Sequence, residues 1–151
     1  MSVTHSQPAR LDDEDLGWMT GRSVEAVSFH EPTLWVLQLS TGGLLSTEFT
    51  WRLSATTGLV ACSGDHGHWF GLPAPVDAAG LAMSALAGRR IVRAAIRSGA
   101  PDLEIHLEGG FLLELLALSQ GYECWQVEDP SGRCVIAHGN REMSTWRGRQ
   151  P

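Results

Sequence analysis

The chain has 151 residues, of which 43% are hydrophobic and 19% are charged. This is the size and composition of one globular domain, and it excludes a disordered or fibrous chain. The formal net charge is −6, and the chain contains arginine but no lysine. Phosphate contacts require a basic excess that this chain lacks, so we do not expect nucleic acid as a partner.

No apolar run reaches the roughly 20 residues of a membrane helix. The N-terminus also lacks the charged-then-apolar pattern of a secretion signal. We therefore expect a cytoplasmic protein with no membrane among its partners. The three cysteines, Cys62, Cys124 and Cys134, cannot all pair within one chain, so free thiols in a reducing compartment are the simplest interpretation.

The two halves of the chain resemble each other. The matches are Gly21-Arg22 with Gly88-Arg89, Gly42-Gly43 with Gly109-Gly110, and Trp51-Arg52-Leu53 with Trp125-Gln126-Val127. We therefore expect one domain over residues 11–146, made by duplication of a unit and divided into about 11–72 and 73–146. Residues 1–10 and 147–151 are expected to be flexible tails.

Each unit is expected to begin with a short helix. The second helix is better marked, because Asp77 is a plausible N-cap, Gly88 is a natural C′ residue, and apolar residues recur between them at helical spacing. The first helix, from Asp12 to Met19, has an acidic first turn that suits a helix N-terminus. Gly17 weakens that prediction.

The remaining segments alternate as strands do. A two-residue turn at Pro130-Ser131 would pair Glu128 with Arg133, which predicts one apolar face whose members are Trp125, Val127, Cys134 and Ile136. The matching face of the first unit is Trp51, Leu53, Val60 and Cys62. A three-residue loop over residues 108–110 pairs Leu107 with Phe111 and separates apolar side chains from Glu104, His106 and Glu114. Residues 111–118 suit a helix by composition alone, but their likeness to residues 44–53 favours a strand.

These elements predict an α+β fold that is mostly antiparallel β, with about eight to ten strands and two helices. Two units, each with one apolar face, would close face to face as a pseudo-symmetric sandwich or barrel.

The densest polar cluster follows a predicted strand and has the sequence Cys-Ser-Gly-Asp-His-Gly-His-Trp, residues 62–69. Asp65, His66 and His68, joined by His138 from the corresponding place in the second unit, are candidate ligands for zinc or another divalent metal, with Cys62 as a further thiolate. The alternative is a polar glycine-rich loop with exposed histidines and no cofactor. No paired CxxC or HExxH motif decides between them.

Two further sets of residues are candidates for binding. Arg89, Arg93 and Arg97 recur every four residues and would share one face of a strand or a helix, where they suit an acidic partner or salt bridges to neighbouring acids. Trp69 and Trp146 follow the last strand of each unit. They are either plugs that close the ends of the fold or exposed anchors for a partner.

Evidence for catalysis is sparse. The chain has no GxSxG elbow, phosphate-binding loop or dinucleotide fingerprint. Glu48, Glu104 and Glu114 are carboxylates that could converge in space, but the sequence does not place them.

The repeated string of Gly-Arg, an alternating strand, a Gly-Gly hairpin and Trp-x-Leu/Val resembles small bacterial domains of unknown function. Some of these accompany toxin systems and act as immunity proteins. The resemblance implies a fold and protein binding, and it assigns no functional residue. The expected function is thus a non-catalytic binding domain of the immunity type, whose partner is another protein or a second copy of itself. The alternative is a small-molecule or metal-binding protein, including a metal-dependent enzyme, centred on the Asp65/His66/His68 loop.

Overall fold

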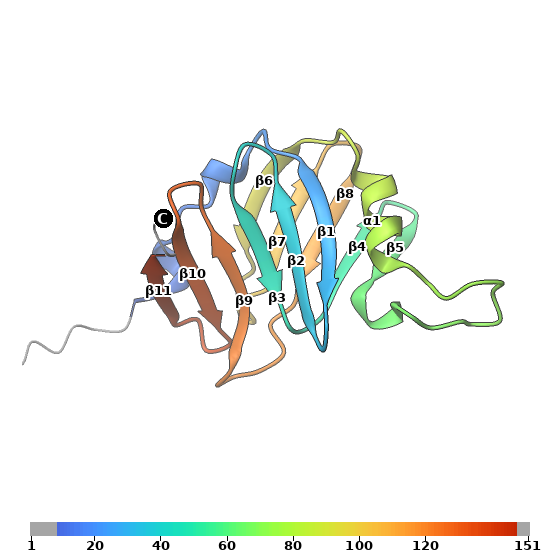
Figure 1. The fold of residues 1–151 in the computed structure, drawn as a ribbon. Coiled ribbons are helices and arrows are strands. Elements are labelled where there is room, and N and C mark those ends of the chain that lie inside the picture. The colour runs from blue at the N-terminus through green and yellow to red at the C-terminus, as the bar shows by residue number, and fades with distance from the viewer. Residues whose placement is uncertain (1–8, 148–151) are drawn as a thin grey trace, which may run out of the picture.

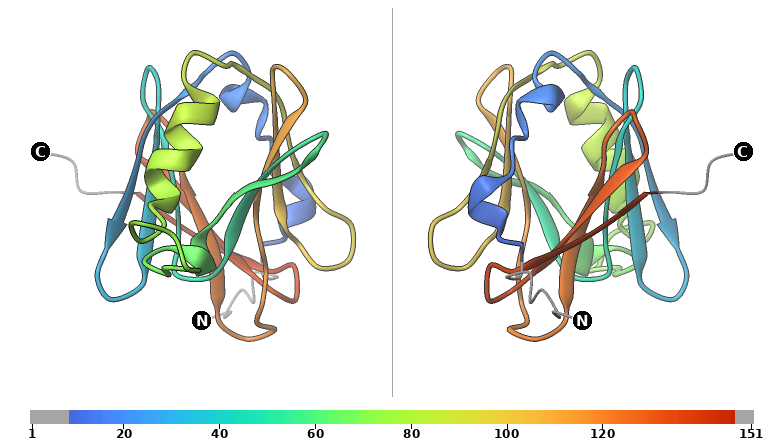
Figure 2. Two further views of the ribbon diagram at one scale, coloured as in Figure 1. Left: turned by 90° about the vertical axis from the view of Figure 1, so that its right-hand side faces the viewer. Right: turned by 90° about the vertical axis from the view of Figure 1, so that its left-hand side faces the viewer.

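The computed structural model describes residues 9–147, which form two antiparallel sheets stacked face to face with one α-helix at the side (Figure 1, Figure 2). The strands are β1 (Val24–His30), β2 (Leu34–Leu39), β3 (Leu44–Thr47), β4 (Trp51–Ala55), β5 (Gly58–Cys62), β6 (Ile91–Ile96), β7 (Leu103–Leu107), β8 (Phe111–Leu115), β9 (Glu123–Glu128), β10 (Arg133–His138) and β11 (Met143–Arg147). The helices are α1 (Ala78–Leu86) and the 3₁₀ turns η1 (Leu11–Asp13), η2 (Gly17–Met19) and η3 (Ser63–Asp65).

Each sheet combines strands from both halves of the chain. The six-stranded sheet has the order β1-β2-β3-β9-β10-β11, and the five-stranded sheet has the order β5-β4-β8-β7-β6. The chain therefore changes sheets between β3 and β4 and again between β8 and β9. The mostly antiparallel fold predicted from the sequence is confirmed.

The core lies between the two sheets and is closed on one side by α1. Trp51 is completely buried and Trp125 nearly so, and the Trp125 indole donates a hydrogen bond to the Pro101 carbonyl at 2.8 Å. Trp35 packs edge-on against Trp51, with ring centroids 5.2 Å apart. The helix lies against β1 and β5, the edge strands of the two sheets on that side (Figure 2).

The helix forms as the sequence predicts. The Asp77 side chain accepts a hydrogen bond from the Gly80 amide at 3.0 Å, and Gly88 follows the helix with φ +73°. The face toward the core carries Ala78, Ala82 and Leu86.

The predicted first helix, Asp12 to Met19, is wrong. This segment contains two single 3₁₀ turns, Leu11–Asp13 and Gly17–Met19, and no α-helix. The Asp15 side chain accepts a hydrogen bond from the Gly17 amide at 2.8 Å, a local bond that competes with helical pairing at a residue of low helix propensity.

The hairpin of β7 and β8 has the predicted register. Leu107 pairs with Phe111, Ile105 with Leu113, and Glu104 with Glu114, around the three-residue loop of residues 108–110. Gly109 and Gly110 both have positive φ, a conformation that glycine adopts without strain and that the bulge position of such a loop requires of one residue.

The predicted register of β9 and β10 is wrong by one residue. Cys134 pairs with Glu128, and Val135 rather than Cys134 lies opposite Val127. The Gly132 amide donates to the Asp129 carbonyl and closes a turn. Gly132 itself takes φ +90° and adds one residue to the loop, which shifts the pairing of the two strands by one residue. The buried pairs are therefore Val127 with Val135 and Trp125 with Ala137.

The predicted core face of the first unit is also wrong in its second strand, again because of a bulge. A bulge in the β4–β5 pairing places Ala61 opposite Leu53, and it is Ala61 that is buried. Val60 and Cys62, which the sequence assigned to the core face, are half-buried.

The first eight residues and the last four, which include most of both predicted tails, lie outside the described residues. Ala9 accepts a backbone hydrogen bond from Met143, and Arg10 forms a bridge with Glu142. Within residues 9–147 no helix has the length and apolarity that crossing a membrane requires.

The bulge at Gly132 generates a stability prediction. Gly132→Ala should lower the free energy of unfolding by about 1–2 kcal/mol, because a Cβ is strained at positive φ. Gly64→Ala is the control, since Gly64 lacks positive φ and has open space around it. Equal denaturation midpoints for the two variants would contradict the assignment of the bulge.

Candidate functional site

A loop between η3 and α1 projects from the body of the molecule, at the right of Figure 1. Its two arms are tied together by backbone hydrogen bonds from Gly67 to Val76 at 2.9 Å and from Val76 to His68 at 2.8 Å. At the tip, the Leu72 amide donates to the Trp69 carbonyl at 2.7 Å and closes a four-residue turn. We call residues 69–72 the tip. The loop is thus a braced hairpin rather than an irregular excursion.

The tip exposes three large apolar side chains. The exposed fractions of Trp69, Phe70 and Leu72 are 57%, 65% and 51%. Phe70 and Gly71, the two central residues of the turn, have φ +43° and +72°. A bulky residue in the left-handed region is unusual, and here its ring faces solvent rather than a packing partner in the core.

His66 anchors the base of the loop. Its ring packs against Trp35 and Phe29, with centroids 5.1 and 5.4 Å apart. Its Nδ1 accepts a hydrogen bond from the Ala78 amide at 3.1 Å, at the first turn of α1. The histidine therefore connects the loop, the core and the helix, which is a structural role.

The apolar surface continues from the tip onto α1. Leu81 is 46% exposed, and an open groove of about 410 Å³ runs between the loop and the helix, lined by Leu72, Ala74, Pro75, Val76, Asp77, Gly80, Leu81 and Ser84. No arginine lies between Arg52 and Arg89, whereas Asp65 and Asp77 flank the loop. The tip is therefore apolar, and the loop that carries it has an aspartate near each end, Asp65 on η3 and Asp77 at the start of α1.

The structure does not bring the predicted metal ligands together. His66 is engaged by α1, His68 stacks on Phe70 with centroids 5.4 Å apart, and His138 is hydrogen bonded to Ser144 at 3.0 Å on the six-stranded sheet. Across residues 9–147 no group of three or more His, Cys, Asp or Glu side chains is arranged to hold a metal ion. Asp65 remains on η3 beside the loop.

Cys62, the further candidate ligand, pairs with Arg52 at the end of β5. Burial raises the pKa of its thiol, and the nearby Asp65 carboxylate raises it further. Burial likewise raises the pKa of Cys134, with Glu128 adding to the effect. Both cysteines therefore favour the thiol over the thiolate near neutral pH, which disfavours them as nucleophiles.

The predicted arginine stripe is interrupted. The β6–β7 pairing skips Val92, so that Ile91 faces the core opposite Leu107 while Arg93 faces outward opposite His106. A bulge of this kind reverses the alternation of faces, and it separates Arg89 from Arg93.

The three arginines consequently have different surroundings. Arg89 donates to the Ala85 carbonyl at 2.8 Å and lies over the Phe111 ring, 4.4 Å from its centroid, so it supports the fold. Arg97 forms an ion pair with Asp102 at 3.7 Å. Arg93 is exposed and forms no ion pair within the described part of the chain, so it is the member best placed to receive an acidic group.

The two candidate tryptophans are exposed, so neither is a plug. Trp146 is 47% exposed and lies opposite Cys134 on the edge strand β11, far along the sheet from the tip. Trp51 and Trp125 are the buried pair, as the sequence predicts.

The three candidate carboxylates do not converge. Glu104 and Glu114 lie opposite each other on β7 and β8, and Glu114 forms an ion pair with Arg52 at 3.0 Å. Glu48 follows β3 in the other sheet.

Sequence reasoning identified Trp69 but missed Phe70, Leu72 and Leu81. The available signal was the run Trp-Phe-Gly-Leu between glycine and proline residues, where apolar side chains neither alternate nor recur at helical spacing. Apolar residues without periodicity in a turn-rich segment have no core face to occupy. Comparison with protein-family models, with curated proteins and with solved structures gives no match to the chain.

The strained tip generates a stability prediction. Phe70→Gly should leave the free energy of unfolding unchanged or raise it by up to about 1 kcal/mol, because relief of the left-handed strain offsets the entropy of glycine. Leu118→Gly is the control, since Leu118 is 57% exposed, against 65% for Phe70, but lacks positive φ. It should lose about 0.5–1 kcal/mol. A clear loss at Phe70, measured by chemical denaturation, would show that its ring stabilises the domain.

The raised thiol pKa values predict slow alkylation. Iodoacetamide should react slowly with Cys62 and Cys134 in the folded protein at pH 7, because the thiolate is the reacting species. The rate should rise only above the usual cysteine pKa of about 8.5. Mass spectrometry of the folded and the urea-unfolded protein measures both rates. A half-maximal rate at or below pH 8 in the folded protein would contradict the assignment.

Proposed function

We propose that this protein is a non-catalytic protein-binding domain whose main contact is the tip, residues 69–72. The observation that carries the proposal is the exposure of Trp69, Phe70 and Leu72 on a hairpin that is braced by backbone hydrogen bonds. Large contiguous apolar patches are uncommon on soluble monomers and mark interaction surfaces. A braced hairpin also loses little conformational entropy on binding, which favours affinity.

The shape of the tip supports a protein as the partner. Small-molecule sites are concave and enclose most of their ligand, whereas this tip projects outward and suits insertion into a pocket of another macromolecule. Tryptophan is enriched among the residues that dominate binding energy, particularly where it fills such a pocket.

The charge of the chain supports a basic partner. The net charge of −6, with Asp65 and Asp77 at the two ends of the loop, favours a partner with a basic surface and raises the association rate. The same charge disfavours nucleic acid and anionic lipid as targets. An acidic immunity protein against a basic toxin, the role implied by the sequence resemblance, is one form of this function.

We also infer that the two halves of the chain descend from one duplicated unit. In the six-stranded sheet, the strands β1-β2-β3 of the first half lie next to the hairpin β9-β10 of the second half. In the five-stranded sheet, the strands β6-β7-β8 of the second half lie next to the hairpin β4-β5 of the first half. The bridge between Ser23 and Arg90 joins positions that match in the sequence alignment of the halves. Arg22 and Arg89 each donate to the carbonyl four residues earlier, Trp18 and Ala85.

Photo-crosslinking tests the proposed function. With benzoylphenylalanine at position 69, we expect an adduct with a basic protein in extracts of the source cells. Position 122 is the matched control, because Tyr122 is 77% exposed on another part of the surface and should give no such adduct. The identified partner should bind Trp69→Ala at least about 30-fold more weakly, as expected for a hot-spot residue, and Tyr122→Ala normally. An adduct of twice the chain mass would instead identify a second copy as the partner. Equal adducts from both positions, or none, would contradict the proposal.

A further inference from the structure

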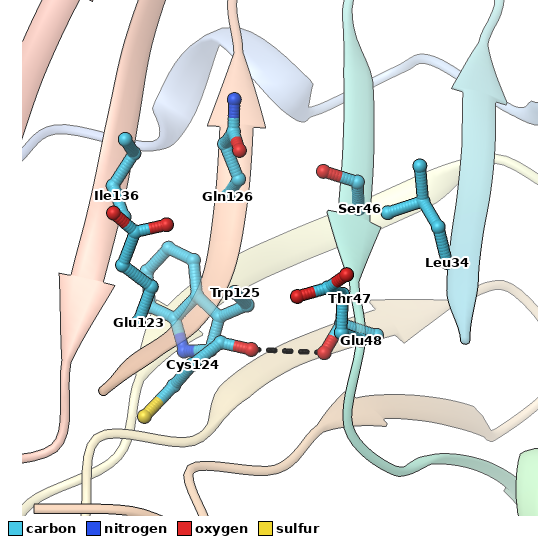
Figure 3. A pocket seen from close by; sticks show the side chains of 9 residues that line it. All are labelled: Leu34, Ser46, Thr47, Glu48, Glu123, Cys124, Trp125, Gln126 and Ile136. Atoms are coloured by element: carbon cyan, nitrogen blue, oxygen red, sulfur yellow. Dashed lines mark hydrogen bonds between the residues drawn. The ribbon is translucent and has the colours of Figure 1, made fainter. Parts of the chain in front are cut away.

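A pocket of about 240 Å³ lies at the junction of the two halves in the six-stranded sheet, where β3 ends and β9 begins (Figure 3). Its walls come from β2, β3, β9 and β10. Ser46 and Gln126 pair across this junction, and the neighbouring pair, Leu45 and Val127, is buried in the core. Because side chains alternate along a strand, Ser46 and Gln126 face away from the core. The pocket is therefore on the outer face of the sheet, remote from the tip.

Ser46 is an unusual residue for an outer face, because only 8% of its surface is exposed. Figure 3 shows its hydroxyl directed into the pocket, toward β9. Besides the backbone bonds of the sheet, the one hydrogen bond among the lining residues joins the Thr47 hydroxyl to the Cys124 carbonyl at 2.8 Å and does not involve Ser46. The Ser46 hydroxyl has no side-chain hydrogen bond within residues 9–147, and it is open to the pocket rather than sealed in the core, so a polar group of a ligand can bond to it.

Two carboxylates border the same pocket. Glu48 follows β3 and Glu123 opens β9, and Figure 3 shows the Glu123 carboxylate beside Ile136 with that of Glu48 on the β3 side. No arginine or histidine lines the pocket. Neither carboxylate forms an ion pair with any residue in the 9–147 range; Glu48 accepts only a long hydrogen bond from Thr33, at 3.4 Å. Leu34 and Ile136 supply apolar wall.

We propose that this pocket binds an alkyl cation, a guanidinium or ammonium group on a short apolar stem. The two carboxylates attract the charge and exclude anions. The Ser46 hydroxyl and the Gln126 carbonyl accept hydrogen bonds from its N–H groups. The stem packs against Leu34 and Ile136. An arginine or lysine side chain of a protein and a free small amine share this chemistry.

This inference does not rest on the proposed function. The tip and the pocket lie on different elements, and each is tested with its own variants. A negative crosslinking result would not affect the proposed cation site, and a negative titration of the pocket would not affect the proposed role of the tip.

The test is a titration of the full chain with n-butylguanidinium, followed by amide NMR spectra. Small ligands of this size bind in about the millimolar range. We expect saturable shifts at Ser46, Gln126 and neighbouring amides, which weaken as salt is added. The neutral analogue n-butylurea has the same shape without the charge and should bind at least about fivefold more weakly.

Variants locate the site. Glu48→Gln with Glu123→Gln should weaken n-butylguanidinium binding about three- to tenfold, because both charges are lost from the border. Ser46→Leu fills the pocket and should abolish binding. Glu25→Gln is the matched control, an exposed carboxylate at the far end of β1 that should change nothing. The thermal midpoint of each variant reports whether it is folded. The double glutamine variant should keep a normal midpoint, because it alters only exposed side chains.

Two further probes distinguish the source of the cation. Blocked N-acetyl-arginine methylamide binding at least as well as n-butylguanidinium supports a protein side chain, whereas preference for free L-arginine supports a metabolite. Equal binding of n-butylurea, shifts outside the pocket, or no saturation up to about 50 mM, well above the expected range, would overturn the proposal.

Discussion

The fold depends on two crossings at which the chain changes sheets. The first runs from β3 to β4 and the second from β8 to β9, and they are bonded to each other: Thr47 donates to the Cys124 carbonyl at 2.8 Å, and the Leu116 amide donates to the Thr50 carbonyl at 2.9 Å. Trp51 opens β4, and Trp125 lies near the start of β9. Burial of two indoles at these points stabilises the crossings, since removing a buried tryptophan side chain costs about 3–5 kcal/mol.

The exchange of strands has a consequence for the surface. Because β3 meets β9 at an interface between the two halves, the outer face there combines Ser46 from one half with Gln126 from the other. Neither half forms the pocket alone. The five-stranded sheet has the corresponding junction at β4 and β8, but there Arg52 and Glu114 fill it with an ion pair at 3.0 Å. The two junctions therefore differ chemically although their strand order is alike.

The tip shows a different relation between stability and function. Its apolar side chains contribute little to the core, and Phe70 has an unfavourable backbone conformation that no packing contact in the core requires. Features of this kind concentrate at functional sites. His66 carries the structural task at the base of the loop by connecting Trp35 to the first turn of α1. The loop that the sequence suggested as a metal site is better explained as a support for the exposed tip.

Local patterns in the sequence determined the β7–β8 register, the capped helix and the burial of Trp51 and Trp125, because alternation, capping and turn chemistry act over a few residues. They did not identify β11, since Trp146 was expected to follow the last strand but lies within this one. Only the tertiary structure decided the rest. Single-residue bulges at Gly132 and Val92 reversed which side chains face the core and separated Arg89 from Arg93. The pocket joins residues about eighty positions apart, Ser46 and Gln126, through a strand pairing that no local pattern encodes. The exposure of the tip likewise depends on where the loop leaves the sheets.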